Sequence, residues 1–136
     1  MHERVLKEIE LVRVKYCSLH YGEKLDWVLI PDYPLPRNQY NKSQIKLLFL
    51  IPSGYPNTGP DNFFVEADLR LVNGGMPLSL NLGAQSSNGI APIQGDWAWF
   101  SWHPKLWRPA DNIEAGDNLL SFLRGVSMCL RGEDNP

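Results

Sequence analysis

The sequence predicts an α+β fold, in which a helix near each end of the chain accompanies an antiparallel sheet. Two observations predict this class. Apolar residues recur at helical spacing near both termini, and four strand-like segments separated by turn residues occupy the first half of the chain. With 136 residues, the chain is expected to form a single domain, 1–136, with a core of ordinary size.

The composition is that of a globular protein in water, with 43% apolar and 21% charged residues. A net charge of −2 gives no basic surface, so neither nucleic acid nor a membrane is the expected partner. The longest apolar run, Leu47–Ile51, is too short to cross a bilayer, and the charged N-terminus lacks a signal region. Cys17 and Cys129 form no disulfide framework, so a cytoplasmic location is expected.

The first third of the chain predicts a short helix followed by a hairpin. Apolar residues at helical spacing among charges predict a modest helix over residues 2–11. Apolar and polar residues alternate over Val12–Cys17, which predicts a half-buried strand. A turn at Tyr21–Lys24 leads to a second strand, Leu25–Ile30, so that the two strands form a hairpin. The prolines of Pro31–Ser43 predict a long ordered loop.

Two further strands complete a predicted four-stranded meander. Gln44–Ile51 is almost continuously apolar, which predicts a central strand covered on both faces. The turn-rich crossing Pro52–Pro60 leads to the fourth strand-like segment, Asn62–Ala67. Asp68–Gly95 has no clear period and is predicted to be a long flap, because loops of this length are usually functional or disordered.

The segment Trp97–Pro109, WAWFSWHPKLWRP, contains four of the five tryptophans. Residues that precede prolines favour extended conformations, so this segment is not a helix. A buried indole removes roughly 200 Å² from water, which is worth about 5 kcal/mol as an upper bound. Four indoles approximately offset an ordering cost of about 1.5 kcal/mol per residue. We therefore expect a fixed, non-helical segment docked on the core, and we expect function there because it carries a serine and a histidine.

A helical apolar stripe over Leu119–Leu130 predicts a C-terminal helix. Asp111 or Asn112 is expected to cap its N-terminus, and Gly132 is expected to end it. A glycine within the stripe, Gly125, weakens the helix by about 1 kcal/mol relative to alanine.

The order of these elements, together with particular motifs, resembles the ubiquitin-conjugating-enzyme fold. Gly54–Pro56 (GYP), Pro60 and then Phe63–Val65 are similar to the Tyr-Pro-x-x-Pro-Pro crossing between the third and fourth strands of those enzymes. Trp107–Pro109 (WRP) and the helix after it are similar to their Trp-x-Pro and following helix. The series GYP, FFV, LRL, NGG, W-x-x-S-x-H and WRP resembles more closely the prokaryotic ubiquitin-conjugating-like family E, over about residues 54–130.

This resemblance implies a step in a bacterial ubiquitin-like conjugation pathway. A partner activating enzyme adenylates the C-terminus of a small ubiquitin-like protein, and this chain receives or positions it. The family context also implies a deconjugating peptidase in the same pathway and a role in antiviral defence. No cofactor is expected in the chain itself.

The sequence departs from ordinary conjugating enzymes at the catalytic position. In those enzymes a cysteine shortly precedes the Trp-x-Pro tryptophan, at a distance that falls near Trp99 here. No cysteine lies between Cys17 and Cys129. The His-Pro-Asn triplet is also absent upstream, since His103-Pro104-Lys105 lies on the wrong side. Thioester chemistry at the usual position is therefore excluded.

Two polar residues of the tryptophan-rich segment are candidates to replace the thiol. Ser101 and His103 alternate, so in an extended chain both side chains project from one face. His103 could take the proton of Ser101 as it forms an oxyester, and Asp111 could orient His103 or accept from an incoming lysine. The alternative is structural: Ser101 satisfies a backbone group, His103 is a packed ring, and Asp111 caps a helix.

The other candidates have simpler explanations. Ser86 or Ser87 could act as a nucleophile with Asn88 as an oxyanion donor, but Ser-Ser-Asn-Gly is also ordinary turn chemistry. Cys17 alternates with basic residues that would lower its pKa, but it belongs to the predicted hairpin, and Cys129 is expected to be a small buried side chain. No metal site is expected, because no ligand spacing relates His2, His20 and His103.

Partner binding is expected to use Tyr55, Pro56, Trp99, Trp102 and Trp107, although such aromatic residues are also typical of a core. Two functions remain open. One is a conjugating enzyme that carries the acyl group on a residue other than cysteine, and the other is a non-catalytic module that binds a ubiquitin-like protein or its activating enzyme. A third, an unrelated enzyme acting on a small molecule, would require a deep apolar cavity under the flap.

Overall fold

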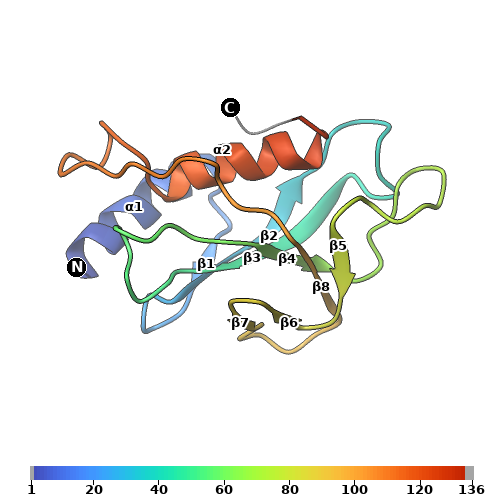
Figure 1. Cartoon of the computed structure of the whole chain (residues 1–136), viewed down its shortest axis with the longest axis horizontal. Helices are drawn as coiled ribbons and strands as arrows, with labels where there is room; N and C mark the ends of the chain where they lie inside the picture. Colours follow the sequence, from blue (N-terminus) through green and yellow to red (C-terminus); the bar gives the residue numbers. More distant parts are fainter. Residues whose placement is uncertain (1, 134–136) are drawn as a thin grey trace.

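The computed structural model describes residues 2–133 and shows two helices on one face of a six-stranded antiparallel sheet (Figure 1). The sheet runs in the order β1-β2-β3-β4-β8-β5. A two-stranded hairpin, β6–β7, lies on the opposite side of the sheet from the helices. The predicted α+β class is confirmed. Strands β1 to β4 form a meander, but its first strand is not the predicted one, and two further strands extend the sheet beyond the prediction.

Helix α1 (His2–Lys15) is longer than predicted and replaces the first predicted strand. Val5, Ile9, Val12 and Tyr16 are buried at steps of three and four residues, which is a helical stripe. The burial of Val12 and Tyr16 fits both the helical period of 3.6 residues and the strand period of 2 residues. Val14, which a strand would bury together with them, is 89% exposed. The prediction of a strand over Val12–Cys17 is therefore wrong, because the helical stripe continues through it.

Strand β1 (His20–Tyr21) forms a short hairpin with β2 (Trp27–Pro34). A hairpin forms as expected at this point of the chain, but its first strand is His20–Tyr21 and not the predicted Val12–Cys17. The second strand continues to Pro34, where the sequence predicts a loop. Since β1 pairs only with Val28 and Leu29, the outer edge of β2 is unpaired beyond them, and prolines that donate no hydrogen bond are tolerated there.

Strand β3 (Gln44–Leu50) lies between β2 and β4 (Phe63–Glu66), as predicted. Its alternate residues face two different clusters. Leu47 belongs to the main core under the helices. The second cluster, on the other face of the sheet, contains Leu48, Phe64 and Trp97. The prediction of a central strand covered on both faces is confirmed.

The flap is partly regular. It contains β5 (Leu80–Leu82), which forms one edge of the sheet, and the hairpin strands β6 (Gln85–Ser86) and β7 (Gly89–Ile90). The sequence shows no period here because each strand has only two or three residues.

Strand β8 (Trp97–Phe100) lies between β4 and β5 and begins the tryptophan-rich segment. Residues 101–118 form neither helix nor strand. Trp97 is buried, and the other indoles of the segment are half-buried (Trp99, Trp102 and Trp107). The prediction of a non-helical segment docked on the core is confirmed.

Helix α2 (Leu119–Leu130) has the predicted bounds, but its N-cap is Asn118 rather than Asp111 or Asn112. Asn118 takes this role because its side chain accepts a hydrogen bond from the backbone N–H three residues later. Gly132, with φ +78°, ends the helix as predicted. Of the helices described within residues 2–133, neither is long and apolar enough to cross a membrane.

Candidate functional site

A groove of about 500 Å³ lies where the end of β8, the flap and the C-terminal end of α2 meet. We refer to it as the Ser101 groove. Parts of the chain that are distant in the sequence form its walls. Its lining includes Tyr40, Leu78, Ser101, His103, Lys105 and Cys129.

The structure brings Ser101 and His103 together at this groove and leaves both side chains exposed. Ser101 directly follows β8, and its backbone N–H donates to the carbonyl oxygen of Ser79 (N···O 3.0 Å). Within the described chain, no hydrogen bond joins the Ser101 hydroxyl to the His103 imidazole. The two groups therefore share a surface without forming a nucleophile–base pair in this conformation.

Trp102, between these two residues, anchors the segment to the sheet and to α2. Its backbone carbonyl accepts from the N–H of Asn62 (2.7 Å), and its own N–H donates to the Asn62 side chain (3.2 Å). The indole packs edge-on against Phe63 and tilted against Phe122, with ring centroids 6.0 and 5.7 Å away. Gly125 leaves room for it, because a Cβ there would lie 2.7 Å from Trp102 Cη2.

The groove also contains a thiol and charged groups. Cys129 lines it from α2, and burial raises the pKa of its thiol to about 11. The thiol is therefore protonated at neutral pH and is a weak nucleophile. Glu133 pairs with Arg131 (2.8 Å), whereas Lys105 forms no ion pair with any residue of 2–133. Lys105 is thus the cation that the groove offers to an anionic group.

The Tyr-Pro crossing lies outside the groove, against the end of the tryptophan-rich segment. The indole N–H of Trp107 donates to the carbonyl oxygen of Pro56 (2.7 Å). The same indole covers Gly59, where a Cβ would lie 2.4 Å from Trp107 Cδ2. Tyr55 is 1% exposed, and its ring centroid lies 5.9 Å from that of Trp107. The two motifs that carry the family resemblance are therefore in direct contact.

Sequence reasoning missed Glu8, a fully buried carboxylate on α1. It accepts hydrogen bonds from Arg4 (2.7 Å), from the backbone N–H of Leu119 (2.8 Å) and from the Tyr55 hydroxyl. Burial first, and then the Glu8 carboxylate, raise the pKa of Tyr55, so the phenol stays protonated and donates. Glu8 therefore joins α1, the crossing and the N-terminus of α2. The available signal was an acidic residue on the apolar face of a helix.

The position at which the family resemblance places a cysteine is occupied by a residue inside a strand. Trp99 lies on β8, in register with Phe64 on β4 and Asn81 on β5. Its half-buried indole packs against the second cluster, on the sheet face away from the helices. Trp99 is therefore not part of the Ser101 groove.

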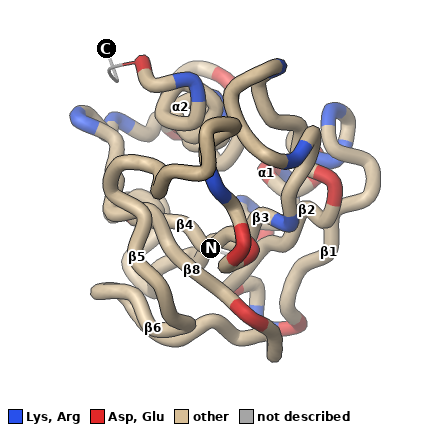
Figure 2. Tube along the Cα trace, turned by 90° about the vertical axis from the view of Figure 1, so that its right-hand side faces the viewer, with Lys and Arg blue, Asp and Glu red and all other residues tan. Residues whose placement is uncertain are grey.

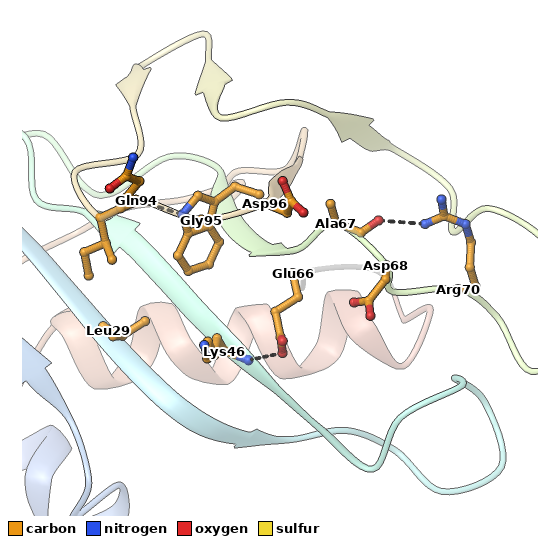
Figure 3. A pocket seen from close by; sticks show the side chains of 11 residues that line it. Leu29, Lys46, Glu66, Ala67, Asp68, Arg70, Gln94, Gly95 and Asp96 are labelled. Carbon is orange, nitrogen blue, oxygen red and sulfur yellow. Dashed lines mark hydrogen bonds between the residues drawn. The ribbon is translucent and has the colours of Figure 1, made fainter.

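A second groove, of about 520 Å³, lies on that same sheet face and is lined mainly by charged and polar side chains (Figure 3). Its charges are largely occupied. Glu66 accepts from the backbone N–H of Lys46 (2.9 Å), Asp68 pairs with Lys42 (3.0 Å), and Arg70 donates to backbone carbonyls. No nucleophile predicted from the sequence lines this groove.

The flap serines make turn contacts. The Ser86 hydroxyl donates to the carbonyl oxygen of Gly89 and accepts from the N–H of Asn88, both at 3.1 Å. The Ser87 hydroxyl accepts from the Asn62 side chain (2.8 Å). The Ser86 contacts match the ordinary turn chemistry that Ser-Ser-Asn-Gly predicts, whereas the Ser87 contact ties the hairpin to the residue before β4.

The other predicted residues also lie apart from the Ser101 groove. Asp111 is exposed in the loop before α2, and Cys17 is exposed in the turn after α1. Over residues 2–133, no three His, Cys, Asp or Glu side chains gather closely enough to hold a metal ion.

The family model described as prokaryotic E2 family E matches residues 5–132, a range that contains the sheet, α2 and most of α1. The chain belongs to prokaryotic E2 family E. Its α+β architecture is consistent with the fold of ubiquitin-conjugating enzymes, for which E2 is the usual designation. A comparison with curated proteins and one with solved structures each found no match.

Membership of prokaryotic E2 family E confirms the resemblance read from the sequence motifs. It indicates a role in ubiquitin-like conjugation in bacteria, with a ubiquitin-like protein and an activating enzyme as the general class of partners.

Proposed function

We propose that this E2 family E protein holds the C-terminal end of a ubiquitin-like protein in the Ser101 groove, after an activating enzyme has adenylated that end. The observation that carries the proposal is that Ser101, His103 and Lys105, all from the tryptophan-rich segment, line one groove. Lys105 supplies a positive charge for the anionic phosphate of the acyl adenylate, and His103 supplies a hydrogen-bond donor for the acyl carbonyl oxygen. The free terminal carboxylate, before activation, offers the same negative charge to Lys105.

The geometry supports positioning of the partner better than acyl transfer. An activated serine requires a base within hydrogen-bond reach, and no hydrogen bond joins Ser101 to His103 in the described chain. Asp111, which was predicted to orient His103, is not a lining residue of the groove. The raised pKa of Cys129 keeps its thiol protonated.

Acyl transfer through Ser101 is a second candidate, favoured by the exposure of Ser101 and His103 on the same groove. The hydroxyl oxygen would attack the carbonyl carbon of the acyl adenylate and form an ester. The adenylate would leave as AMP with the electron pair of the broken bond, and His103 would take the hydroxyl proton. An acceptor amine would then attack the carbonyl carbon of the ester and form an amide. The bond between that carbon and the Ser101 oxygen would break, and His103 would return the proton to this oxygen.

Intact-mass spectrometry separates the two candidates. The protein is mixed with activating enzyme, ATP and ubiquitin-like protein. Positioning alone gives a non-covalent complex and no covalent adduct. Acyl transfer gives an adduct that resists thiol reductant, is cleaved by hydroxylamine, and disappears in Ser101→Ala and His103→Ala. Ser43→Ala, an exposed serine outside the groove, is the matched control and keeps any adduct.

Charge reversal at the groove tests the proposed binding. Lys105→Glu is expected to weaken the complex with the ubiquitin-like protein about tenfold, the effect of losing one charged hydrogen bond. Lys24→Glu, at an exposed turn before β2, is the matched control and leaves the affinity unchanged. Equal affinities for the wild type and Lys105→Glu would contradict the assignment of the groove.

We also propose the wider setting that the family resemblance implies: a cytoplasmic pathway with a deconjugating peptidase, acting in antiviral defence. Its support is the resemblance alone. Sequencing the genes that flank this one tests it, because a neighbouring adenylating enzyme and peptidase are expected.

A further inference from the structure

Strand β5 (Leu80–Leu82) is an edge strand, and within residues 2–133 the sheet has no further strand on its outer side. The carbonyl oxygen of Ser79 accepts from the N–H of Ser101, which directly follows β8, and the N–H of Gly83 donates to the carbonyl oxygen of Trp97 on β8, each with an N···O distance of 3.0 Å. Hydrogen-bonding direction alternates along an antiparallel pair, so the backbone groups of Leu80 and Leu82 face outward. The N–H of Leu80 already bonds within its own turn (3.3 Å). The carbonyl of Leu80 and both groups of Leu82 therefore face away from the sheet.

This edge lacks the charges that usually protect edge strands. No Asp, Glu, Lys or Arg occurs over residues 71–95, and the trace through β5 and β6 in Figure 2 carries no charged residue. Leu78 is 91% exposed and Leu82 is 61% exposed. Free edges are normally blunted by charged side chains, proline, bulges or very short strands, and of these β5 has only its short length. Apolar side chains exposed close together mark binding surfaces. The edge of β5 is therefore suited to the addition of a strand.

The edge leads directly to the Ser101 groove. Leu78 and Ser79, which precede β5, line that groove. A segment that follows the edge toward the groove passes Leu82 first and Leu78 last, so it runs antiparallel to β5. At the end of this path it meets Lys105, which has no ion-pair partner within residues 2–133, and the imidazole of His103. A terminal carboxylate fits this end.

We propose that the C-terminal tail of the ubiquitin-like protein adds to β5 as a seventh, antiparallel strand, with its terminal carboxyl end in the Ser101 groove. This inference rests on the proposed function and adds how the tail is held. Main-chain hydrogen bonds to Leu80 and Leu82 supply register, Leu78 and Leu82 supply apolar contacts, and Lys105 selects the end of the tail.

A peptide tail fits this edge better than a second copy of the chain. Stable interfaces bury more than about 1,000 Å² in total. An edge of three residues with two flanking leucines does not provide that area. A tail needs only a short hydrogen-bonded ladder and a site for its end, and it can bind weakly and reversibly.

Titration of the ¹⁵N-labelled protein with a defined peptide tests the proposal. The probe is acetyl-Val-Thr-Val-Thr-Gly-Gly with a free carboxyl end. Saturable shifts are expected at the amides of Leu82 and Lys105, and amidation of the peptide's carboxyl end is expected to weaken binding about tenfold. No binding, or shifts confined to other surfaces, would overturn the proposal.

Leu82→Pro is the decisive variant, because it removes an outward N–H without removing a bond to β8. It is expected to melt like the wild type and to lose peptide binding. Leu82→Ala, the matched control, keeps the N–H and loses only the apolar contact of the side chain, so it is expected to bind more weakly than the wild type but measurably. Unchanged binding by a folded Leu82→Pro would overturn the proposal. If Leu82→Pro does not fold, a peptide N-methylated at alternate residues replaces it: loss of binding supports strand addition, and full binding overturns it.

Two measurements keep this inference separate from the proposed function. If the ubiquitin-like protein binds wild type and Leu82→Pro equally, strand addition is wrong and the proposed function stands. If it binds neither protein but the peptide still adds to β5, the proposed function is wrong. A concentration-dependent dimer that Leu82→Pro abolishes, without peptide binding, would assign the edge to a second copy and overturn the proposal.

Discussion

Glu8 shows how one side chain organises parts of the chain that lie far apart in the sequence. A buried carboxylate is costly unless its oxygens accept hydrogen bonds, and here a guanidinium, a phenol and the first backbone N–H of α2 provide them. Its position at a helix N-terminus adds a favourable interaction with the helix dipole. These contacts fix the crossing and the N-terminus of α2 relative to α1, and therefore fix the end of the loop that leads into α2.

Replacing Glu8 is expected to destabilise the protein strongly. Glu8→Gln cannot accept all three hydrogen bonds and leaves Arg4 without its charge partner, so we expect the free energy of unfolding to fall by about 2–4 kcal/mol. Urea denaturation monitored by tryptophan fluorescence measures this loss. Glu10→Gln, which breaks an exposed pair with Arg13, changes stability by less than about 1 kcal/mol. Similar losses in both variants would contradict the role of Glu8.

At this scale, sequence reasoning found some residues of the candidate site and not others. Ser101 and His103 were selected for their chemistry and do line one groove. Lys105 continues the alternation of Ser101 and His103, so the sequence carries a local signal for it. For Cys129 there is none, because the groove forms only when the C-terminal end of α2 packs beside the flap. A contact between parts of the chain that are distant in sequence leaves no local pattern.

At the scale of elements, α2 is capped at both ends, and each cap holds the chain that adjoins it. Asn118 and Ser121 form a reciprocal capping box, with N···O distances of 2.8 and 2.9 Å. At the other end, the N–H of Gly132 bonds to Cys129 and that of Glu133 to Met128, which is a Schellman arrangement. Because Cys129, Gly132 and Glu133 also line the Ser101 groove, this cap shapes one wall of the site.

Alanine substitutions distinguish the observed N-cap of α2, Asn118, from the predicted one, Asp111. Asn118→Ala is expected to lower the free energy of unfolding by about 1 kcal/mol, since the Ser121 N–H loses its acceptor. Asp111→Ala, at the position where the sequence predicted a cap, leaves stability within about 0.5 kcal/mol of the wild type. Thermal denaturation of both variants checks the difference, and the reverse order of effects would contradict the assignment.

The packing of Trp102 against α2 explains why this helix contains Gly125, a residue with low helix propensity. Gly125→Ala adds a methyl group 2.7 Å from the Trp102 indole. We expect overpacking of about 1–3 kcal/mol to exceed the gain in helix propensity of about 1 kcal/mol, so the variant is less stable. Chemical denaturation measures the loss, with Arg124→Ala, an exposed neighbour, as the control. A more stable Gly125→Ala would show that Trp102 moves aside freely.

Elements with one dominant pattern were predictable, and elements with two competing patterns were not. The apolar run of β3 and the glycine after α2 each had one interpretation. Val12 and Tyr16 fit both a helix and a strand, and burial against the core decided for the helix. The prolines of β2 indicated a loop, but the unpaired outer edge of that strand accepts them.

At the scale of the whole molecule, buried groups that must stay neutral set its response to alkaline pH. Burial raises the pKa of the Cys129 thiol to about 11, and burial first and then Cys129 raise the pKa of Tyr40 to about 12. In the unfolded chain these groups ionise near their ordinary values, about 8.5 and 10. The unfolded state therefore loses their protons first as the pH rises.

The free energy of unfolding is accordingly expected to be constant with respect to these groups below about pH 8.5 and to fall as the pH rises toward 11 and 12. Urea denaturation at a series of pH values measures this decline. Cys129→Ala removes part of the decline between about pH 8.5 and 11, whereas Cys17→Ala, at an exposed thiol, leaves the curve unchanged. A stability independent of pH over this range would contradict the raised pKa of the half-buried Cys129 thiol.

The sheet as a whole was only partly predictable. The meander from β1 to β4 follows neighbouring segments in the sequence, whereas β8 inserts between β4 and β5 after the flap. This insertion depends on pairing between segments separated by tens of residues, for which the sequence of the flap offers no periodic pattern.

The placement of β8 between two strands affects how a partner would be recognised. Ser101 begins where a strand hydrogen-bonded on both edges ends, and Trp102 then locks the backbone against α2. The recognition surface is thus preorganised before any encounter, so the entropic penalty of association falls on the incoming molecule rather than on this chain. A surface of this kind would favour tails that adopt an extended conformation at a low cost in conformational entropy.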